Sequence, residues 1–244
     1  MRMKFLKRIR TLMNNENSMR DVLGHSLLVD THDARMSMFF CAYDPFEDGT
    51  DFTMKKCIPQ SITFAKEMLP QIYKTICSYV EGDQQPKRLS IADVGGGVGA
   101  GSEYIRARLQ MRFLDTQVYM AIIEINGRYR EWCNHFSPKI SFLCEDIFRH
   151  EGIYDYIICS HTVEHVTSPS IFIRRIQQLA RKNVFVYAPY MEQPLPQEAG
   201  HISTVDDTLI DQLNPLEKIY INSEGYSQKE CVLLVLPGCA NDIS

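Results

Sequence analysis

Three side chains that can take part in acid–base chemistry stand close together at His161, Glu164 and His165. A further histidine, His201, follows a segment at residues 194–200 that contains proline and glycine. Imidazoles and carboxylates are the groups that accept a proton from an alcohol near neutral pH. We therefore predict His201 or His165 as a catalytic base. The alternative is that both histidines hydrogen-bond the backbone of their own loops.

The spacing His161-x-x-Glu164-His165 also matches the HxxEH pattern of one class of zinc peptidases. In such enzymes a long helix places both histidines on one face, and a third ligand follows downstream. Here Pro169 follows soon afterwards, and the segment opens directly from an apolar, strand-like run. The prediction is that no metal binds, with a site that uses His201 as a third ligand as the alternative.

A second group of candidates surrounds a glycine-rich stretch that begins at Asp93 and has glycines at positions 95, 96, 97, 99 and 101. Glycine allows the backbone to approach a ligand closely, and the start of the helix that follows attracts negative groups. Gly95, Gly97 and Ala100 fit the dinucleotide pattern GxGxxA. Asp93, however, would oppose a pyrophosphate and suits a ligand that carries an ammonium group.

Polar residues also end the next apolar runs. Glu124 ends the second run, Glu145-Asp146-Ile147 follows the third, and Ser160 ends the fourth. Ligands of parallel sheets bind beyond the carboxyl ends of the strands, so we expect these residues to lie near the glycines. Taken alone, Glu124 could be a solvated strand end, and Asp146 could cap the segment that follows it.

The elements that must position these residues are short apolar strands that alternate with helices. The pattern predicts a helix at 61–80, which Pro70 should kink or split. Strands are then predicted at 89–94, 118–124, 140–144, 154–160 and 184–188, and helices at 101–112, 127–134, 169–180 and 204–213. Thr204 and Asp207 are spaced like a capping box for the last helix. Runs at 218–222 and 231–236 have only a turn between them and predict an antiparallel hairpin.

This order predicts an α/β fold, a mostly parallel sheet with helices on both faces. With its motifs, over roughly residues 60 to 240, it resembles the class I S-adenosylmethionine-dependent methyltransferases. Asp93-x-Gly95-x-Gly97-x-Gly99 looks like the first motif of that family. The element Glu164-His165-Val166 is similar to one in its small-molecule and glycan branch. The resemblance implies a Rossmann-like sheet of seven strands and S-adenosylmethionine as the cofactor.

The resemblance also implies roles for individual residues. Glu124 corresponds to the acid that binds both ribose hydroxyls, and Asp146 to the acid that accepts the adenine amino group. The implied cofactor-binding residues are Asp93, Gly95, Gly97, Gly99, Glu124, Asp146, Ile147 and Ser160. The run Gly95-Gly96-Gly97 departs from the family in having no side chain at its middle position, which predicts a more flexible turn.

Composition and charge limit the partners. The chain has 244 residues, 45% of them apolar, and a net charge of −4. Residues 1–20 carry +5, so the rest carries −9, and such an acidic body argues against a groove for nucleic acid. No apolar run approaches the about 20 residues of a membrane span. The basic, amphipathic residues 1–13 could contact an anionic membrane surface, or could form an ordinary surface helix.

The eight cysteines show no CxxC spacing, and no signal peptide is visible, which predicts reduced thiols and a cytoplasmic location. We expect a helical or irregular extension and lid at 1–60 and one catalytic domain at 61–244. The predicted function is methylation of a small-molecule or sugar/glycan acceptor, at oxygen and with a histidine base. Two alternatives remain: an inactive binding protein with the same fold, and a nicotinamide-dependent oxidoreductase.

Overall fold

The computed structural model describes residues 57–80, 86–192 and 200–240. The expected N-terminal extension up to residue 56, with the amphipathic segment 1–13, lies outside the described residues, and so does the loop segment 194–199. Within the described part of the chain, no helix is both long enough and apolar enough to cross a membrane.

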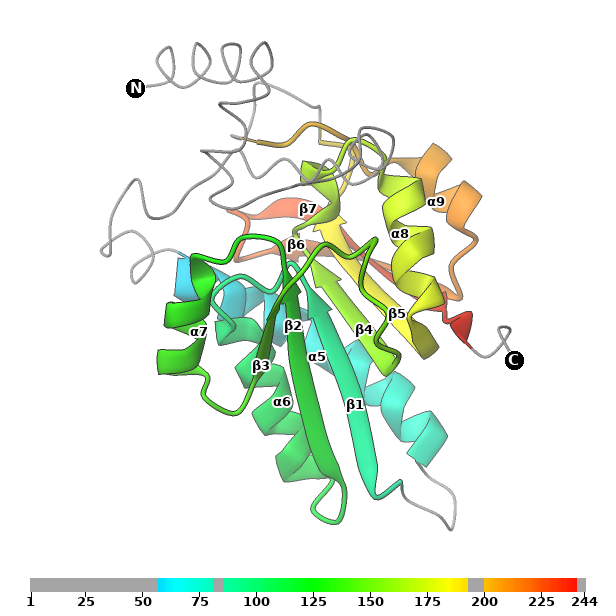
Figure 1. Cartoon of the computed structure of the whole chain (residues 1–244). Coiled ribbons are helices and arrows are strands. Elements are labelled where there is room, and N and C mark those ends of the chain that lie inside the picture. The colour runs from blue at the N-terminus through cyan, green and yellow to red at the C-terminus, as the bar shows by residue number, and fades with distance from the viewer. Residues whose placement is uncertain (1–56, 81–85, 193–199, 241–244) are drawn as a thin grey trace.

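A single seven-stranded sheet runs through the centre of the molecule in the order β3-β2-β1-β4-β5-β7-β6 (Figure 1). Strands β1 to β5 pair in parallel, whereas β7 pairs antiparallel with both β5 and β6. The predicted parallel sheet with a C-terminal hairpin is therefore confirmed. The strands are β1 Arg88–Val94, β2 Gln117–Glu124, β3 Ser141–Cys144, β4 Tyr154–Ser160, β5 Ala180–Pro189, β6 Glu217–Ser223 and β7 Lys229–Pro237.

The central strands β1, β4 and β5 are buried on both faces because helices cover both. In β1, Leu89 and Ile91 belong to one hydrophobic core, whereas Ala92 and Val94 belong to the other. This alternation follows from the two-residue repeat of a strand. It also directs Asp93 to the same face as Ile91, at the end of the strand.

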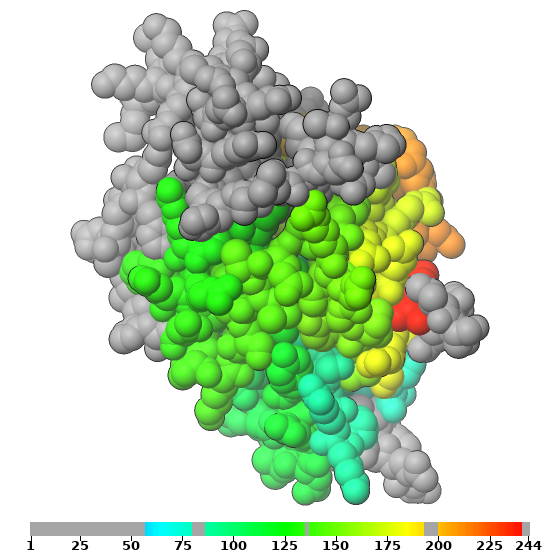
Figure 2. Space-filling model, in the orientation of Figure 1, coloured from blue at the N-terminus to red at the C-terminus, as the bar shows by residue number. Residues whose placement is uncertain are grey.

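Helices α5 (Ile58–Val80), α6 (Ala100–Arg112) and α7 (Tyr129–Phe136) contribute to the first core, and α8 (Pro169–Gln178) and α9 (Asp207–Leu213) to the second. On the face seen in Figure 2, the residues that lead from β3 to α8 form one continuous surface. Helix α5 continues through Pro70, so the predicted split does not occur. Pro70 and Lys66, whose carbonyl loses its helical partner, are both exposed.

The start of α9 differs from the predicted capping box. Asp206 is the capping residue, and its side chain accepts a hydrogen bond from the Leu209 backbone at 2.8 Å. Thr204 instead donates its hydroxyl to the carbonyl of Glu192, at 2.7 Å. This bond ties the segment that carries His201 to the chain just beyond β5.

Candidate active site

The glycine-rich turn between β1 and α6 is packed from two sides. Gly95 has a φ of +76°, and a Cβ at this position would lie 2.3 Å from Oγ1 of Thr162, beyond β4. A Cβ on Gly96 would lie 3.0 Å from the Asp93 carboxyl and 3.0 Å from Ile122. The absence of side chains therefore allows the turn to pack closely against its neighbours. This close packing explains why a glycine stands at position 96, whereas the sequence had suggested flexibility.

Asp93 lies in β1 just before this turn, and one of its two carboxylate oxygens accepts a hydrogen bond. Its Oδ2 accepts a hydrogen bond from the Ser102 hydroxyl at 2.6 Å, whereas Oδ1 is buried and has no partner among the described residues. Burial raises the pKa of Asp93 to about 7. A buried acceptor without a partner costs roughly 1–3 kcal/mol, so Oδ1 is suited to receive a donor from a ligand.

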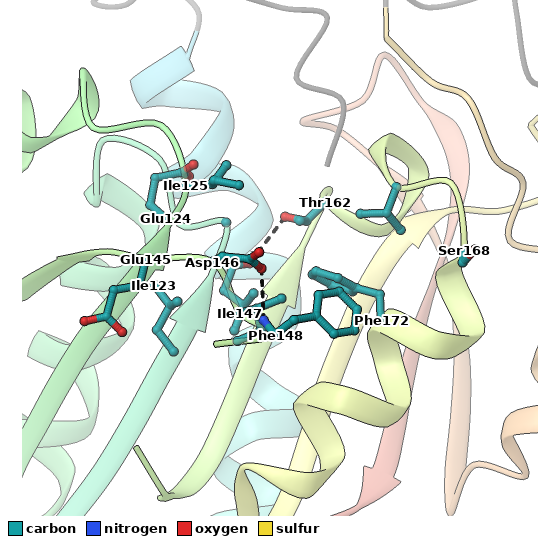
Figure 3. A pocket seen from close by; sticks show the side chains of 13 residues that line it. Ile123, Glu124, Ile125, Glu145, Asp146, Ile147, Phe148, Thr162, Ser168 and Phe172 are labelled. Carbon is teal, nitrogen blue, oxygen red and sulfur yellow. Dashed lines mark hydrogen bonds between the residues drawn. The ribbon is translucent and has the colours of Figure 1, made fainter. Parts of the chain in front are cut away.

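On one side of the turn a pocket of about 440 Å³ opens beyond the ends of β2 and β3 (Figure 3). Asp146 Oδ1 accepts from the Phe148 backbone at 2.9 Å, while Oδ2 is buried and lacks a partner within the described residues. Asp146 thus caps the segment after β3 and still offers a free acceptor. The predicted residues in the lining are Gly95, Glu124, Asp146 and Ile147.

Glu124 connects the end of β2 to the glycine turn. Its side chain accepts from the backbone of Gly97 at 3.2 Å and of Asn126 at 2.9 Å. Burial raises its pKa to about 7. Each carboxylate oxygen has two lone pairs, so each can accept a further hydrogen bond from a hydroxyl group.

On the other side of the turn a larger cleft of about 840 Å³ is open to solvent. It is lined by Asp93, Gly95, Gly97 and Ser160 of the predicted set, and by α5 residues that include Phe64 and Met68. The Gly97 Cβ position has no atom of the described residues within 4 Å.

Gly99 lies away from both pockets. It is the residue before α6, with a φ of +83°, and its carbonyl accepts from the Glu103 backbone at 2.8 Å. A Cβ there would lie 3.0 Å from both Cys133 and Ile122, so Gly99 shapes the turn and lines neither pocket.

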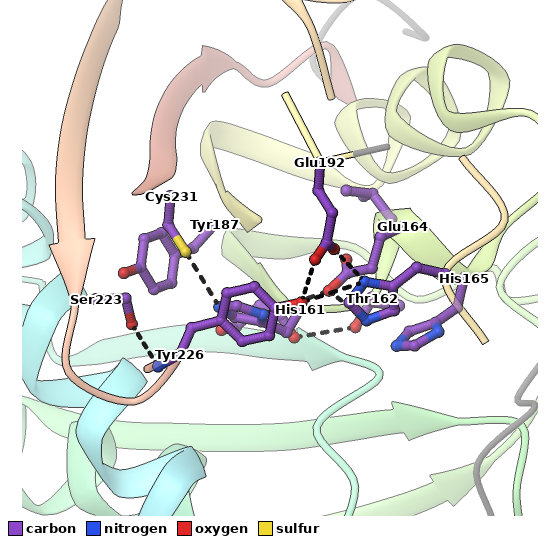
Figure 4. A network of polar contacts seen from close by, with 12 residues as sticks. His161, Thr162, Glu164, His165, Tyr187, Glu192, Ser223, Tyr226 and Cys231 are labelled. Atoms are coloured by element: carbon purple, nitrogen blue, oxygen red, sulfur yellow. Dashed lines mark hydrogen bonds and ion pairs between the residues drawn. The ribbon is translucent and has the colours of Figure 1, made fainter. Parts of the chain in front are cut away.

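His201 is buried and belongs to a polar cluster with Glu164, His165, Glu192 and Tyr226. Figure 4 shows these four partners beyond the ends of β4 and β5. Its Nδ1 makes a short hydrogen bond to Glu192 Oε2. The other oxygen of Glu192 accepts from the Tyr226 hydroxyl at 2.7 Å and from Lys229 Nζ at 3.1 Å. Glu192 therefore fixes the orientation of the His201 ring and leaves Nε2 on the opposite side.

His165 and Glu164 complete the cluster. His165 Nδ1 lies 3.0 Å from the Gly200 carbonyl, and the rings of His165 and His201 are in edge contact, with centroids 4.8 Å apart. Glu164 is 2% exposed, and its Oε1 lies 4.0 Å from His201 Nε2 and 3.3 Å from His161 Nδ1. Burial acts to raise the pKa of Glu164, but the surrounding imidazoles outweigh it and lower the pKa to about 2. Burial also lowers the pKa of His165, which favours its neutral form.

His161 joins this cluster to the larger cleft. Its ring stacks on Phe64 with centroids 3.7 Å apart and lines the cleft, while Nδ1 faces Glu164. Neither His165 nor His201 is part of the lining of the two pockets. His161 has a φ of 49°, a left-handed conformation that is uncommon for a residue other than glycine and that occurs at functional sites.

Several side chains of the site were not predicted from the sequence. Glu192 follows β5 at the functional edge of the sheet, a position that could have indicated it. Tyr226 comes from the turn between β6 and β7, and no local pattern distinguishes it. Thr162 lies just beyond β4, and its packing on Gly95 depends on a contact between separate strands that no local pattern indicates.

Comparisons with known proteins agree with this geometry. A family model described as a methyltransferase domain matches residues 67–210. Similar solved structures include the plantazolicin methyltransferase BpumL with a bound analogue and SAH (15% identity, TM-score 0.54, covering 85% of this chain and 97% of that one). The magnesium protoporphyrin IX methyltransferase from Synechocystis with bound SAH is similar as well (14% identity, TM-score 0.53, covering 90% and 97%).

A third similar structure is the CurJ carbon methyltransferase, at 12% identity and a TM-score of 0.53. The match covers 80% of this chain and spans 62% of the CurJ chain. No curated protein sequence matches. The structural likenesses support the fold, and the family model covers more than half of the chain. The chain therefore belongs to the methyltransferase-domain family of class I S-adenosylmethionine-dependent enzymes.

Proposed function

We propose that this protein transfers a methyl group from S-adenosylmethionine to an oxygen atom of a small-molecule or glycan acceptor. One observation carries the proposal. Two pockets flank the glycine turn, and each holds a buried carboxylate oxygen without a partner in the described part of the chain, Asp93 Oδ1 and Asp146 Oδ2. Two such acceptors, one in each of the pockets that share Gly95, suit a ligand that carries two separate amino groups.

The residues fit the cofactor part by part. Asp93 would accept a hydrogen bond from the ammonium group at the amino-acid end of the cofactor. The open space at the Gly97 Cβ position leaves room for the rest of that end. Glu124 would accept the ribose hydroxyls, and Asp146 Oδ2 the adenine amino group, next to the apolar Ile147. When bound, S-adenosylmethionine supplies a methyl group already activated on a sulfonium sulfur, so the protein mainly aligns the acceptor and excludes water.

The larger cleft favours a neutral acceptor. Among the described residues that line it, Asp93 is the one carboxylate, and no lysine or arginine is present. Apolar Phe64 and Met68 lie beside polar Gln60 and Ser61 on α5. This mixture suits an acceptor that has both apolar and hydroxyl-bearing parts.

We assign the acid–base role to His201, with His165 as the other candidate. Nδ1 of His201 is held by Glu192, so Nε2 is the atom that can take a proton. The acceptor oxygen would lose its proton to Nε2 and form a bond to the methyl carbon as the carbon–sulfur bond breaks. The products are a methyl ether and the neutral demethylated cofactor.

Binding of the demethylated cofactor, measured by calorimetry, tests the cofactor half. We expect Asp93→Ala and Asp146→Ala each to weaken binding at least about tenfold, because each removes a charged or charge-assisted hydrogen bond. Asp115→Ala, at an exposed position outside both pockets, is the matched control. No heat at millimolar ligand would contradict the proposal.

Transfer of a labelled methyl group to a panel of hydroxylated small molecules and sugars tests the acceptor half. A protein that binds the demethylated cofactor but methylates no member of any acceptor class would favour the inactive binding protein. Saturable binding of a nicotinamide dinucleotide, with its absorbance change, would favour the oxidoreductase. The cytoplasmic location, the lid and the membrane contact of residues 1–13 stay predictions from the sequence.

A further inference from the structure

The cluster of Glu164, His165 and His201 brings groups with free lone pairs together. The Gly200 carbonyl can only accept a hydrogen bond, so Nδ1 of His165 must carry the proton of that bond. The Nδ1 of His201 likewise points to the Glu192 carboxylate. In neutral rings, both Nε2 atoms are then left as acceptors.

The Glu164 carboxylate faces these rings and accepts only. It is 2% exposed, and His161 Nδ1 faces its Oε1 at 3.3 Å, whereas its Oε2 has no hydrogen-bond partner within the described ranges of the chain. Nε2 of His201 lies 4.0 Å from Oε1, too far for a proton on that nitrogen to form a hydrogen bond. The Nε2 atoms of the two histidines and the Glu164 carboxylate therefore converge with no donor between them, and a cation placed there would stabilise them.

The three possible ligand atoms, and the hydrogen bonds that orient the two histidines, match those of a metal site. One ligand atom from each of Glu164, His165 and His201 lies within 4.8 Å of the others. Both histidines are oriented through Nδ1 by an oxygen acceptor, one a carboxylate and one a backbone carbonyl. Metal-ligating histidines in proteins almost always have such a partner on the second nitrogen.

We propose that Glu164, His165 and His201 bind one divalent transition-metal ion. Two imidazoles and a carboxylate suit ions such as Zn²⁺, Mn²⁺ or Fe²⁺ and leave coordination positions open. Metal–ligand bonds of about 2.1 Å place ligand atoms roughly 3.0–3.4 Å apart, so binding draws the three side chains closer together. This site was the alternative to the prediction, made from the sequence, that no metal binds.

The role of the ion rests on the proposed function, whereas its binding does not. An open coordination position beside the cleft would hold the acceptor through a hydroxyl oxygen and lower the pKa of that hydroxyl. His201 Nε2 is then a ligand, and the proton of the acceptor passes to solvent water. His161 lines the cleft and contacts Glu164, so it connects the proposed metal site to the acceptor cleft.

Calorimetry of the full chain, freed of metal with a chelator and titrated with Zn²⁺ or Mn²⁺, tests the site. Co²⁺ adds a visible spectrum that reports histidine coordination. We expect one tight site per chain. Glu164→Gln, His165→Ala and His201→Ala should each weaken binding at least about 100-fold, and Glu192→Gln, an outer partner, about 10- to 100-fold.

Glu131→Gln, at an exposed position on α7, is the matched control and should bind metal as the wild type does. Binding of the demethylated cofactor shows that each variant is folded. Absence of metal binding at millimolar ion, or binding that none of the three ligand variants weakens, would overturn the site.

The two proposals can fail separately. Cofactor binding and transfer that persist fully in chelator would overturn the role of the ion and leave His201 as the base. Metal binding that needs all three ligands, in a protein that binds no cofactor, would support the site and contradict the proposed function. Transfer that is lost in chelator and restored by Zn²⁺ or Mn²⁺ would support both methyl transfer and the role of the ion, with His201 as a ligand in place of the base.

Discussion

The predicted cofactor-binding residues come from consecutive strand ends and turns between Asp93 and Ser160, whereas the cluster around His201 draws on separate segments. Glu124 is held by the backbone of Gly97 and Asn126, both at neighbouring strand ends. In the cluster, His201 meets Glu192 beyond β5 and Tyr226 from the β6–β7 turn. The first half of the site is built by local strand–turn geometry, and the second by tertiary packing.

The two regions also differ in how many of their carboxylate oxygens already accept hydrogen bonds. Each cofactor-side carboxylate Asp93 and Asp146 has one oxygen held and one free, a state ready for a ligand. Both oxygens of Glu192 are in use, by His201 on one side and by Tyr226 and Lys229 on the other. The cofactor half is therefore organised to bind a ligand, whereas Glu192 is organised to orient an imidazole.

The largest effect should come from the acceptor half. His201→Ala should lower turnover by about 10²- to 10⁴-fold, whether the imidazole acts as base or as ligand, and leave cofactor affinity unchanged. Steady-state kinetics with the identified acceptor, together with calorimetry, measure both quantities.

His150→Ala is the matched control, because His150 is also buried and pairs with a carboxylate, Glu145, at 2.7 Å. It should cost stability but not turnover per folded molecule. Wild-type turnover in His201→Ala would remove this residue from the reaction.

Gly95→Ala should disrupt the packing of the glycine turn on Thr162, which joins the cofactor pockets to the segment after β4. A left-handed φ costs a non-glycine residue about 1–2 kcal/mol, and the new Cβ would overlap Thr162. We expect the free energy of unfolding to fall by about 2–4 kcal/mol in denaturant titrations. Gly97→Ala shares the positive φ but faces open space, so it should cost only the smaller, conformational part. Equal losses in the two variants would show that Thr162 yields easily.

Glu124→Ala should weaken binding of the demethylated cofactor by about 10- to 100-fold, because hydrogen bonds to a charged group contribute about 1.5–3 kcal/mol. Calorimetry above pH 7.5 measures it with the carboxylate ionised. Glu131→Ala, exposed on α7, should bind normally. An unchanged dissociation constant in Glu124→Ala would move the ribose contact to another residue.

Cofactor binding should also depend on pH through the buried acids. Burial raises the pKa of both Asp93 and Glu124 to about 7. The free folded protein therefore binds more protons than the unfolded chain between about pH 4 and 7, and its stability falls as pH rises through this window. A bound ammonium group favours ionised Asp93, so binding releases a proton below pH 7.

Affinity for the demethylated cofactor should accordingly rise about tenfold per group between pH 6 and 8, and then level off. Asp93→Asn should flatten part of this dependence. Calorimetry in buffers of different ionisation enthalpy counts the released protons, and a release of none would contradict the argument.

Tyr226→Phe should have the smallest effect. It removes one hydrogen bond to the charged Glu192 carboxylate, worth about 1.5 kcal/mol, and leaves Lys229 in place, so turnover should fall only about tenfold. Cofactor affinity should not change. A loss as large as that of His201→Ala would mean that the phenol itself takes part in the reaction.

The sequence alone determined the order of strands and helices and the position of the cofactor motif. The boundaries of β4 were predicted to the residue, because alternating or continuous apolar runs reflect burial along the chain itself. Asp93, Glu124 and Asp146 could be identified because each stands at the end of such a run, and parallel strands bring their carboxyl ends to one edge. Thr204 was misread as a cap, because its hydroxyl finds the Glu192 carbonyl across a loop.

Only the tertiary structure decided which partners meet around the histidines. Glu192 and Tyr226 are 34 residues apart in the chain, and their contact exists because β7 pairs antiparallel with β5 and carries the β6–β7 turn toward His201. No local periodicity encodes that contact. The same packing leaves Glu164 buried between two oriented imidazoles. Residue types therefore predicted a reactive site, but the choice between base and metal ligand depends on side chains brought together from distant segments.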